Sequence, residues 1–142
     1  MAARRGRPSQ IARRRTSAGK ASSTPDTRHG HGLDHDRDVA HTLIPDPASE
    51  VTIQAGAVVS KVLHRVGGLN ATVFAFDAGE QLTEHQAART ALVQVLSGHL
   101  RFTVDDEELD LAPGSWLHMA PGAPHSLMAT KPTVMLLTLI SE

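Results

Sequence analysis

The pattern of apolar and polar positions changes sharply near residue 50. Before that point large apolar residues are rare, whereas from Glu50 onward they come in short runs that Gly, Pro and Asp interrupt at regular intervals. Short apolar or alternating runs bounded by turn residues are typical of β-strands. No stretch of useful length has the spacing of an amphipathic helix. The pattern therefore predicts an all-β domain over residues 50–142.

Eight segments fit the strand pattern, namely 57–64, 71–77, 91–96, 100–104, 108–111, 116–119, 125–129 and 133–140. Gly67-Gly68 supplies positive φ for a tight turn after the first segment, and Asp105-Asp106 is expected to form a hairpin turn. The last segment is almost continuously apolar, as in a strand covered on both faces or one that pairs with another subunit. Short strands in this number predict a sandwich or a double-sheet barrel.

The amino-terminal residues 1–45 have a different composition. Residues 1–28 hold eight Lys/Arg against one Asp, a net charge of +7, whereas residues 29–142 hold six against fourteen Asp/Glu, a net charge of −8. So few apolar side chains cannot offset the entropy lost on ordering. We therefore expect a disordered tail over 1–45, rich in Arg and Ser at first and then in His and Asp.

Three interpretations of this tail remain open. The preferred one is a solvated segment, or a start codon placed too early. The alternatives are an organelle transit peptide and a basic arm that contacts nucleic acid or anionic lipid through residues 13–15. The four histidines of residues 29–41 are His29, His31, His35 and His41. We expect them to lie in a hydrated linker, because no apolar anchor fixes a metal-binding geometry there.

The composition excludes several classes of protein. The chain has no cysteine, so disulfides and thiolate chemistry are excluded. It has one Trp, three Phe and no Tyr, too few for surfaces on which single-stranded nucleic acid stacks. No apolar run is long enough to span a bilayer, and no secretory leader is visible. We expect a cytoplasmic protein that does not bind membranes, and nucleic acid is not an expected partner.

One stretch resembles the first sequence motif of the cupin superfamily. That motif has a Gly, five residues, His-x-His, three or four residues, a Glu, six residues and a Gly. Here Gly79 is followed after five residues by His85, and Gly98 closes the motif in the sequence VLSG. The second His of the motif is replaced by Ala87, and the Glu is replaced by Ala91.

A later stretch resembles the second cupin motif, which has a Gly, five residues, Pro-x-Gly, two residues, a His, three residues and an Asn. Here Gly114 opens the motif, and Gly122 and His125 follow at the expected spacing. The Pro is displaced by one position to Pro121, and the Asn is replaced by Ala129. The chain is similar to small bacterial single-domain cupins of the type-2 group. That resemblance implies an RmlC-like jelly-roll barrel, also described as a double-stranded β-helix.

The resemblance also implies a metal site, of which His85 and His125 are the remaining ligands. A first-row metal normally takes at least three protein ligands. His118 and Gln94 are further candidates, although strand alternation places Gln94 on the opposite face from Ala91. The cofactor is therefore either a divalent metal (Zn, Ni, Fe or Mn) or none. The loss of the carboxylate makes the expected pocket more apolar, with Ala87, Ala91, Val93 and Leu127 among its lining residues.

Three functions are consistent with these features. The first is a small-molecule enzyme with dioxygenase- or isomerase-like chemistry, which requires a bound metal. The second is a metal-free module that binds or senses a small, mostly apolar ligand through its two imidazoles. The third, ranked last, is nucleic-acid interaction through the Arg-rich tail. The family tendency and the apolar run 133–140 also predict a homodimer.

Overall fold

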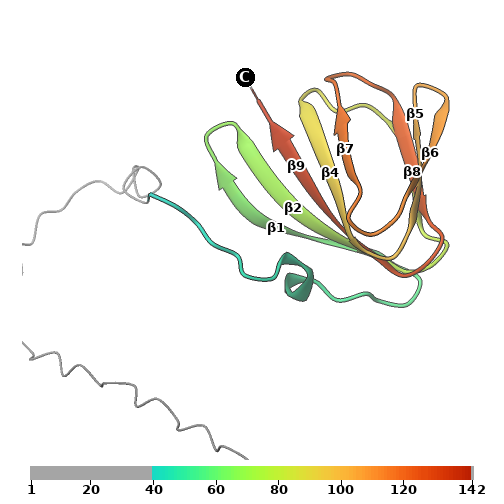
Figure 1. Ribbon diagram of the computed structural model, residues 1–142, viewed down its shortest axis with the longest axis horizontal. Helices are drawn as coiled ribbons and strands as arrows, with labels where there is room; N and C mark the ends of the chain where they lie inside the picture. The colour runs from blue at the N-terminus through green and yellow to red at the C-terminus, as the bar shows by residue number, and fades with distance from the viewer. Residues whose placement is uncertain (1–39, 142) are drawn as a thin grey trace, which may run out of the picture. The chain divides into compact units, whose positions relative to one another are not determined.

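The structure of the chain is a computed structural model that describes residues 40–141. Within that range a short 3₁₀ helix, η1, precedes nine strands (Figure 1). The elements are η1 Pro47–Glu50, β1 Val58–Val66, β2 Leu69–Phe76, β3 Gln81–His85, β4 Thr90–Ser97, β5 Leu100–Val104, β6 Glu107–Leu111, β7 Trp116–Met119, β8 His125–Ala129 and β9 Thr133–Ile140. None of these elements is a helix long and apolar enough to cross a membrane.

The strands form two antiparallel sheets. The larger has the order β1-β2-β9-β4-β7 and the smaller has the order β3-β8-β5-β6. Strands distant in the sequence become neighbours, as where β9 lies between β2 and β4 (Figure 1). Two facing sheets with these crossovers make a jelly roll. The predicted all-β jelly-roll fold is confirmed.

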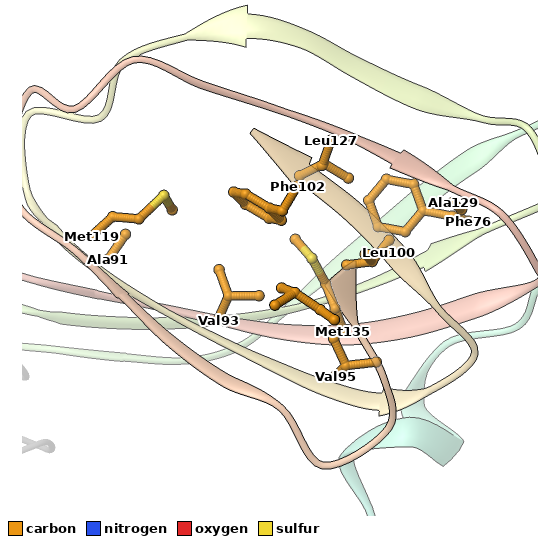
Figure 2. Close-up of a cluster of buried hydrophobic side chains, with 11 residues drawn as sticks. Phe76, Ala91, Val93, Val95, Leu100, Phe102, Met119, Leu127, Ala129 and Met135 are labelled. Carbon is orange, nitrogen blue, oxygen red and sulfur yellow. The ribbon is translucent and has the colours of Figure 1, made fainter. Parts of the chain in front are cut away.

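The core lies between the inner faces of the two sheets. Val93 and Met135 come from the larger sheet, whereas Phe102 and Leu127 come from the smaller, and all four pack in one buried cluster (Figure 2). Alternation along each strand sends every second side chain inward. The burial of these large apolar side chains is the main favourable term in the stability of the barrel.

Two hairpin turns have the backbone geometry that the sequence predicts. Gly67, which separates β1 from β2, has a φ of 51°. Asp105 and Asp106, between β5 and β6, have φ values of 47° and 66°. Consecutive positive φ values belong to the type I′ turn, whose twist matches that of the flanking strands.

All eight predicted strands are present, with ends that differ by up to two residues. The structure adds a ninth, β3, which the sequence pattern does not predict. This strand is polar apart from Leu82, and its side chains are mostly exposed. Its register with β8 shifts between Leu82 and His85. A short polar edge strand with a bulge lacks the alternation by which strands are recognised.

The predicted tail falls mainly on residues 1–39, which lie outside the described residues. Of its four clustered histidines, only His41 is described, and its side chain is exposed. Residues 47–51 pack against the barrel, where Ala48 and Val51 contact a small cluster on the larger sheet.

Candidate functional site

Two histidines that are forty residues apart in sequence lie directly opposite each other in the smaller sheet. His85 ends β3 and His125 begins β8, and their Cα positions are register partners. Cross-strand partners project from the same face of a sheet. His125 shares its face with Leu127 and Ala129, which are both in the core, so the pair projects from the inner face.

The two imidazole rings are in close contact. Their centroids are 4.1 Å apart, and the ring planes meet at 63° in an edge-to-face arrangement. His125 is only 6% exposed, whereas His85 is exposed. Phe102 lies nearly parallel to the ring of His125 at a centroid distance of 6.0 Å. The buried ring is thus supported by the core, and its partner lies at the solvent boundary.

Each ring is anchored by the same kind of hydrogen bond. Nδ1 of His85 lies 2.8 Å from the carbonyl oxygen of Thr83, and Nδ1 of His125 lies 2.9 Å from that of Ala123. A carbonyl oxygen only accepts hydrogen bonds, so Nδ1 carries the proton in both rings. In the neutral tautomer this leaves the lone pair of each Nε2 available. Nδ1 anchoring to a backbone carbonyl is also how proteins orient metal-ligating histidines.

Three of the four residues proposed to line the pocket lie in the packed core. Ala91 and Val93 are each 1% exposed, and Leu127 is 4% exposed. Figure 2 shows Ala91 beside Met119 at one end of the cluster. Ala87 is half-buried. Ala91, Val93 and Leu127 therefore belong to the filled interior, and of the four residues only Ala87 is partly exposed.

The two further candidate ligands lie on the opposite side of the larger sheet. Gln94 is exposed and stands between the inward-facing Val93 and Val95 on β4. His118 is exposed and precedes the buried Met119 on β7. Alternation thus places Gln94 and His118 on the outer face, away from His85 and His125.

A small acidic hollow adjoins His125. Its volume is about 150 Å³, and His125, Pro124, Thr103 and Ser126 form part of its wall. Glu84, Asp105 and Asp106 also line it. Glu84 belongs to the hollow rather than to the inner face, which agrees with the expectation that it points away from the side chain of His85. The carboxylates give the neighbourhood of the pair a negative potential.

Residues 72–140 match the sequence profile of the cupin domain family. A conserved protein of unknown function from Streptococcus pyogenes is 32% identical, and the match covers 73% of this chain and 91% of that one with a TM-score of 0.66. A cupin 2 conserved barrel domain protein from Leptotrichia buccalis is 35% identical over 66% of this chain and 46% of that one, with a TM-score of 0.64. The chain belongs to the cupin superfamily.

Other similar structures are more distant. A putative mannose-6-phosphate isomerase from Ralstonia eutropha is 19% identical, and the match covers 71% of this chain and 100% of that one with a TM-score of 0.63. At that identity the likeness supports the fold alone. No curated protein sequence gives a significant match to this cupin. The neighbours thus establish the family without assigning an activity, in keeping with the many functions that one fold supports.

The donor set of this cupin does not fit a resident metal with a full set of protein ligands. Alanines stand at the positions of the second motif histidine, the motif glutamate and the motif asparagine, namely Ala87, Ala91 and Ala129. Within residues 40–141 no group of three or more His, Cys, Asp or Glu side chains is placed to hold a metal ion. Two imidazole nitrogens therefore remain, one fewer than the usual minimum.

Sequence reasoning did not identify the groups that orient the two rings. These groups are the carbonyl oxygens of Thr83 and Ala123 and the ring of Phe102. A backbone carbonyl leaves no trace in a sequence pattern, because every residue has one. Phe102 alternates with Leu100 and Val104 as an ordinary core residue, so its contact with His125 emerges only from the packing of β5 against β8.

Proposed function

We propose that this cupin binds a small, mostly apolar molecule at the mouth of the barrel, through the Nε2 atoms of His85 and His125. The observation that carries the proposal is the shared anchoring of both Nδ1 atoms by backbone carbonyls. Because the protons are fixed on Nδ1, two adjacent acceptors face the ligand site in the neutral pair. Such a site favours a ligand with an O–H or N–H donor on a small apolar body.

The charges near the site narrow the ligand class further. Glu84, Asp105 and Asp106 line the hollow beside His125. Their negative potential disfavours an anionic ligand and tolerates a neutral one. The alanines at the motif positions add no charge. A small neutral alcohol, phenol or amide therefore matches the site best, and the function is that of a binding or sensing module.

A second candidate function keeps a divalent metal on the same pair. It is favoured by the Nδ1–H···O=C anchoring, which presents Nε2 as a ligand. It requires water or the bound molecule to supply the remaining ligands, because the described residues offer no third side chain. With a metal, dioxygenase- or isomerase-like chemistry becomes accessible.

The experiment compares the purified wild-type chain with His85→Ala and His125→Ala. Metal content is measured by elemental mass spectrometry, and binding of phenol and benzyl alcohol is followed through the ¹⁵N shifts of the imidazole nitrogens. We expect less than about 0.1 metal per chain, and ligand-induced shifts confined to the Nε2 atoms of the two histidines. Both variants lose those shifts, whereas the exposed His41→Ala retains them.

The two candidates give different results. If the wild-type chain holds about one metal ion and both variants lose it, the proposal is wrong and the metal-dependent function takes its place. Ligand shifts that persist in His85→Ala and His125→Ala would place the binding site elsewhere. His125 is buried against Phe102, so circular dichroism is used to check that the His125→Ala variant is folded. His85 is exposed, so His85→Ala is the variant that loses less packing.

A further inference from the structure

A small pocket, which we call the outer pocket, lies where β4 begins and β9 ends. Its volume is about 210 Å³, and it is lined by Ala88, Arg89, Thr90, Pro121, Ile140 and Ser141. Thr90 and Ile140 are register partners that face outward, because their neighbours Ala91 and Leu139 pack in the core. The histidine pair projects from the inner face of the smaller sheet, so the outer pocket is a separate place in the barrel.

Backbone hydrogen bonds hold the walls of the outer pocket. The N–H of Gly122 donates to the carbonyl oxygen of Ala87 at 2.7 Å, which ties the β7–β8 loop to the β3–β4 loop. The N–H of Ser141 donates to the carbonyl oxygen of Gly68, also at 2.7 Å, which fixes the end of β9 against the β1–β2 turn. The pocket is therefore formed before any ligand arrives, and this lowers the entropic cost of binding.

Arg89 is the charged residue of the outer pocket, and no carboxylate lines it. No ion pair within residues 40–141 involves Arg89, whereas two other cations, Lys61 and Arg101, are each paired with a glutamate. A guanidinium group presents its N–H donors in a planar fork that matches the two oxygens of a carboxylate. The fork of Arg89 is therefore available to an anion from outside the described chain.

Two other hollows of the described chain have the opposite character. The hollow beside His125 is lined by three carboxylates, and the hollow around Arg101 is lined by two. In the second of these, Glu108 lies 3.5 Å from Arg101 and competes for its guanidinium group. Residues 40–141 hold ten Asp/Glu against five Lys/Arg, so most of this surface repels anions. Of the three, only the outer pocket has a cation and no carboxylate.

The remaining lining groups define what the anion must look like. They are apolar at Ala88, Pro121 and Ile140 and carry hydroxyl groups at Thr90 and Ser141. The hydroxyls can donate further hydrogen bonds to an oxygen, and the apolar groups favour a carbon body. A volume of about 210 Å³ is below the range of about 300–1,000 Å³ that is usual for drug-sized ligands. The ligand is therefore a small one.

We propose that the outer pocket binds a small monocarboxylate. Its two oxygens accept hydrogen bonds from the guanidinium group of Arg89, and its apolar body lies against Ile140 and Pro121. Inorganic phosphate also matches a guanidinium fork, but it has no apolar surface to place against these two side chains. The site is independent of the histidine pair, so a ligand there does not need His85 or His125.

The experiment follows the side-chain Nε–H signal of Arg89 by NMR in the full chain while benzoate is added. Benzamide, which has the same shape without the charge, and inorganic phosphate are added in parallel. We expect benzoate to shift the signal saturably, with a dissociation constant on the order of 1 mM because the ion pair is open to solvent. Benzamide and phosphate should bind at least tenfold more weakly.

Arg89→Gln tests the contact, and Lys131→Gln is its matched control. Both side chains are exposed and both substitutions remove one positive charge, but Lys131 lies in the β8–β9 turn, at the other end of β9. With the backbone amides of Thr90 and Ser141 as reporters, we expect Arg89→Gln to raise the dissociation constant of benzoate at least tenfold. Lys131→Gln should leave it unchanged within twofold.

Two more variants separate the geometry of the contact from its charge and from the histidine pair. Arg89→Lys keeps the charge without the planar fork, so it should weaken benzoate binding about three- to tenfold. His85→Ala should leave benzoate binding unchanged within twofold, which distinguishes this site from the function proposed for the histidine pair.

Four results would overturn the proposal. Benzoate might leave the signals of Arg89, Thr90 and Ser141 unshifted, or bind Arg89→Gln as tightly as wild type. Benzamide or phosphate binding as tightly as benzoate would remove the carboxylate as the ligand class. Loss of benzoate binding in His85→Ala would place the carboxylate at the histidine pair instead.

Discussion

At the scale of single residues, Gly98 is fixed by its surroundings. It has a φ of 84°, and a Cβ at this position would overlap the carbonyl oxygen of Pro132 and the hydroxyl of Thr133. Thr133 is fully buried, and its hydroxyl also accepts the backbone N–H of His99 at 3.0 Å. Gly98 therefore lets the β4–β5 turn approach the start of β9 closely. The sequence motif predicts this glycine, and the contact supplies the physical reason for it.

We expect Gly98→Ala to lower the free energy of unfolding by about 2–5 kcal/mol. Positive φ costs alanine about 1–2 kcal/mol, and overpacking costs about 1–3 kcal/mol more. Gly114→Ala is the matched control, since Gly114 has a φ of 88° but a Cβ added there would meet no atom within 4 Å. It should lose only about 1–2 kcal/mol. Urea unfolding measures both, and equal losses would contradict the role of the close approach.

The histidine pair shows what motif spacing achieves at this scale. The spacing predicts that His85 and His125 belong to one site, and the structure brings their rings to a centroid distance of 4.1 Å. The spacing does not predict that both Nδ1 atoms donate to backbone carbonyls. That feature depends on the bulge in β3 and on the turn before β8, whose geometries arise from tertiary contacts.

At the scale of elements, the β5–β6 hairpin has a turn that its sequence tolerates rather than favours. Asp105 and Asp106 both have positive φ, which most residues avoid. Asn-Gly is the preferred pair for a type I′ turn. We expect Asp105→Asn with Asp106→Gly to raise the free energy of unfolding by about 0.5–1.5 kcal/mol, measured by thermal or urea unfolding.

The substitution also removes two negative charges, so its control must separate charge from conformation. The variant Asp105→Asn with Asp106→Asn removes the same charges without adding a glycine. This control should gain less stability, because it gains only what comes from reduced repulsion with Glu107 and Glu108 and not what glycine adds at a positive φ. If the two double variants gain equally, the positive φ of the turn is not the source of the effect.

The strands themselves show where local pattern is sufficient. Strands β4, β8 and β9 are apolar enough to be recognised individually, and their predicted ranges agree closely with the structure. β3 was missed because four of its five residues are polar. It is a strand because it pairs with β8 at the edge of the smaller sheet, and that long-range pairing does not depend on its own apolar pattern.

At the scale of the whole molecule, the barrel is separable from the chemistry of its site. Ala91 packs in the core next to Met119 and Val93, so the position of the motif glutamate has become part of the hydrophobic interior. Ala87, at the position of the second motif histidine, remains half-buried at the mouth. The fold is kept while the ligand set is reduced, as expected when function resides in the site.

We expect the double variant Ala87→His, Ala91→Glu to acquire metal binding. It would supply two donors to join His85 and His125. Without metal the buried carboxylate lowers the melting temperature relative to wild type. Excess Zn²⁺ or Ni²⁺ should raise the melting temperature again. At a metal concentration one hundred times Kd, binding adds about 2.7 kcal/mol to the free energy of unfolding.

Differential scanning calorimetry with and without metal measures the effect. Wild type and the double variant combined with both His85→Ala and His125→Ala serve as controls, because each has only two of the four donors, and neither should respond to the metal. If neither metal changes the melting temperature of the double variant, the side chains at positions 85, 87, 91 and 125 do not come close enough in this barrel to bind one metal ion.

The sequence by itself determined the all-β class, the places of eight strands, the two tight turns and the cupin family, because alternation, turn residues and motif spacing are local properties. It also determined that two histidines remain where the motif has four ligands. Only the tertiary structure decided that the interior is filled, that β3 pairs with β8 and that backbone carbonyl oxygens hold Nδ1 of both rings. Those features depend on which surfaces and backbone groups meet across strands, and the residues that meet lie far apart in the chain.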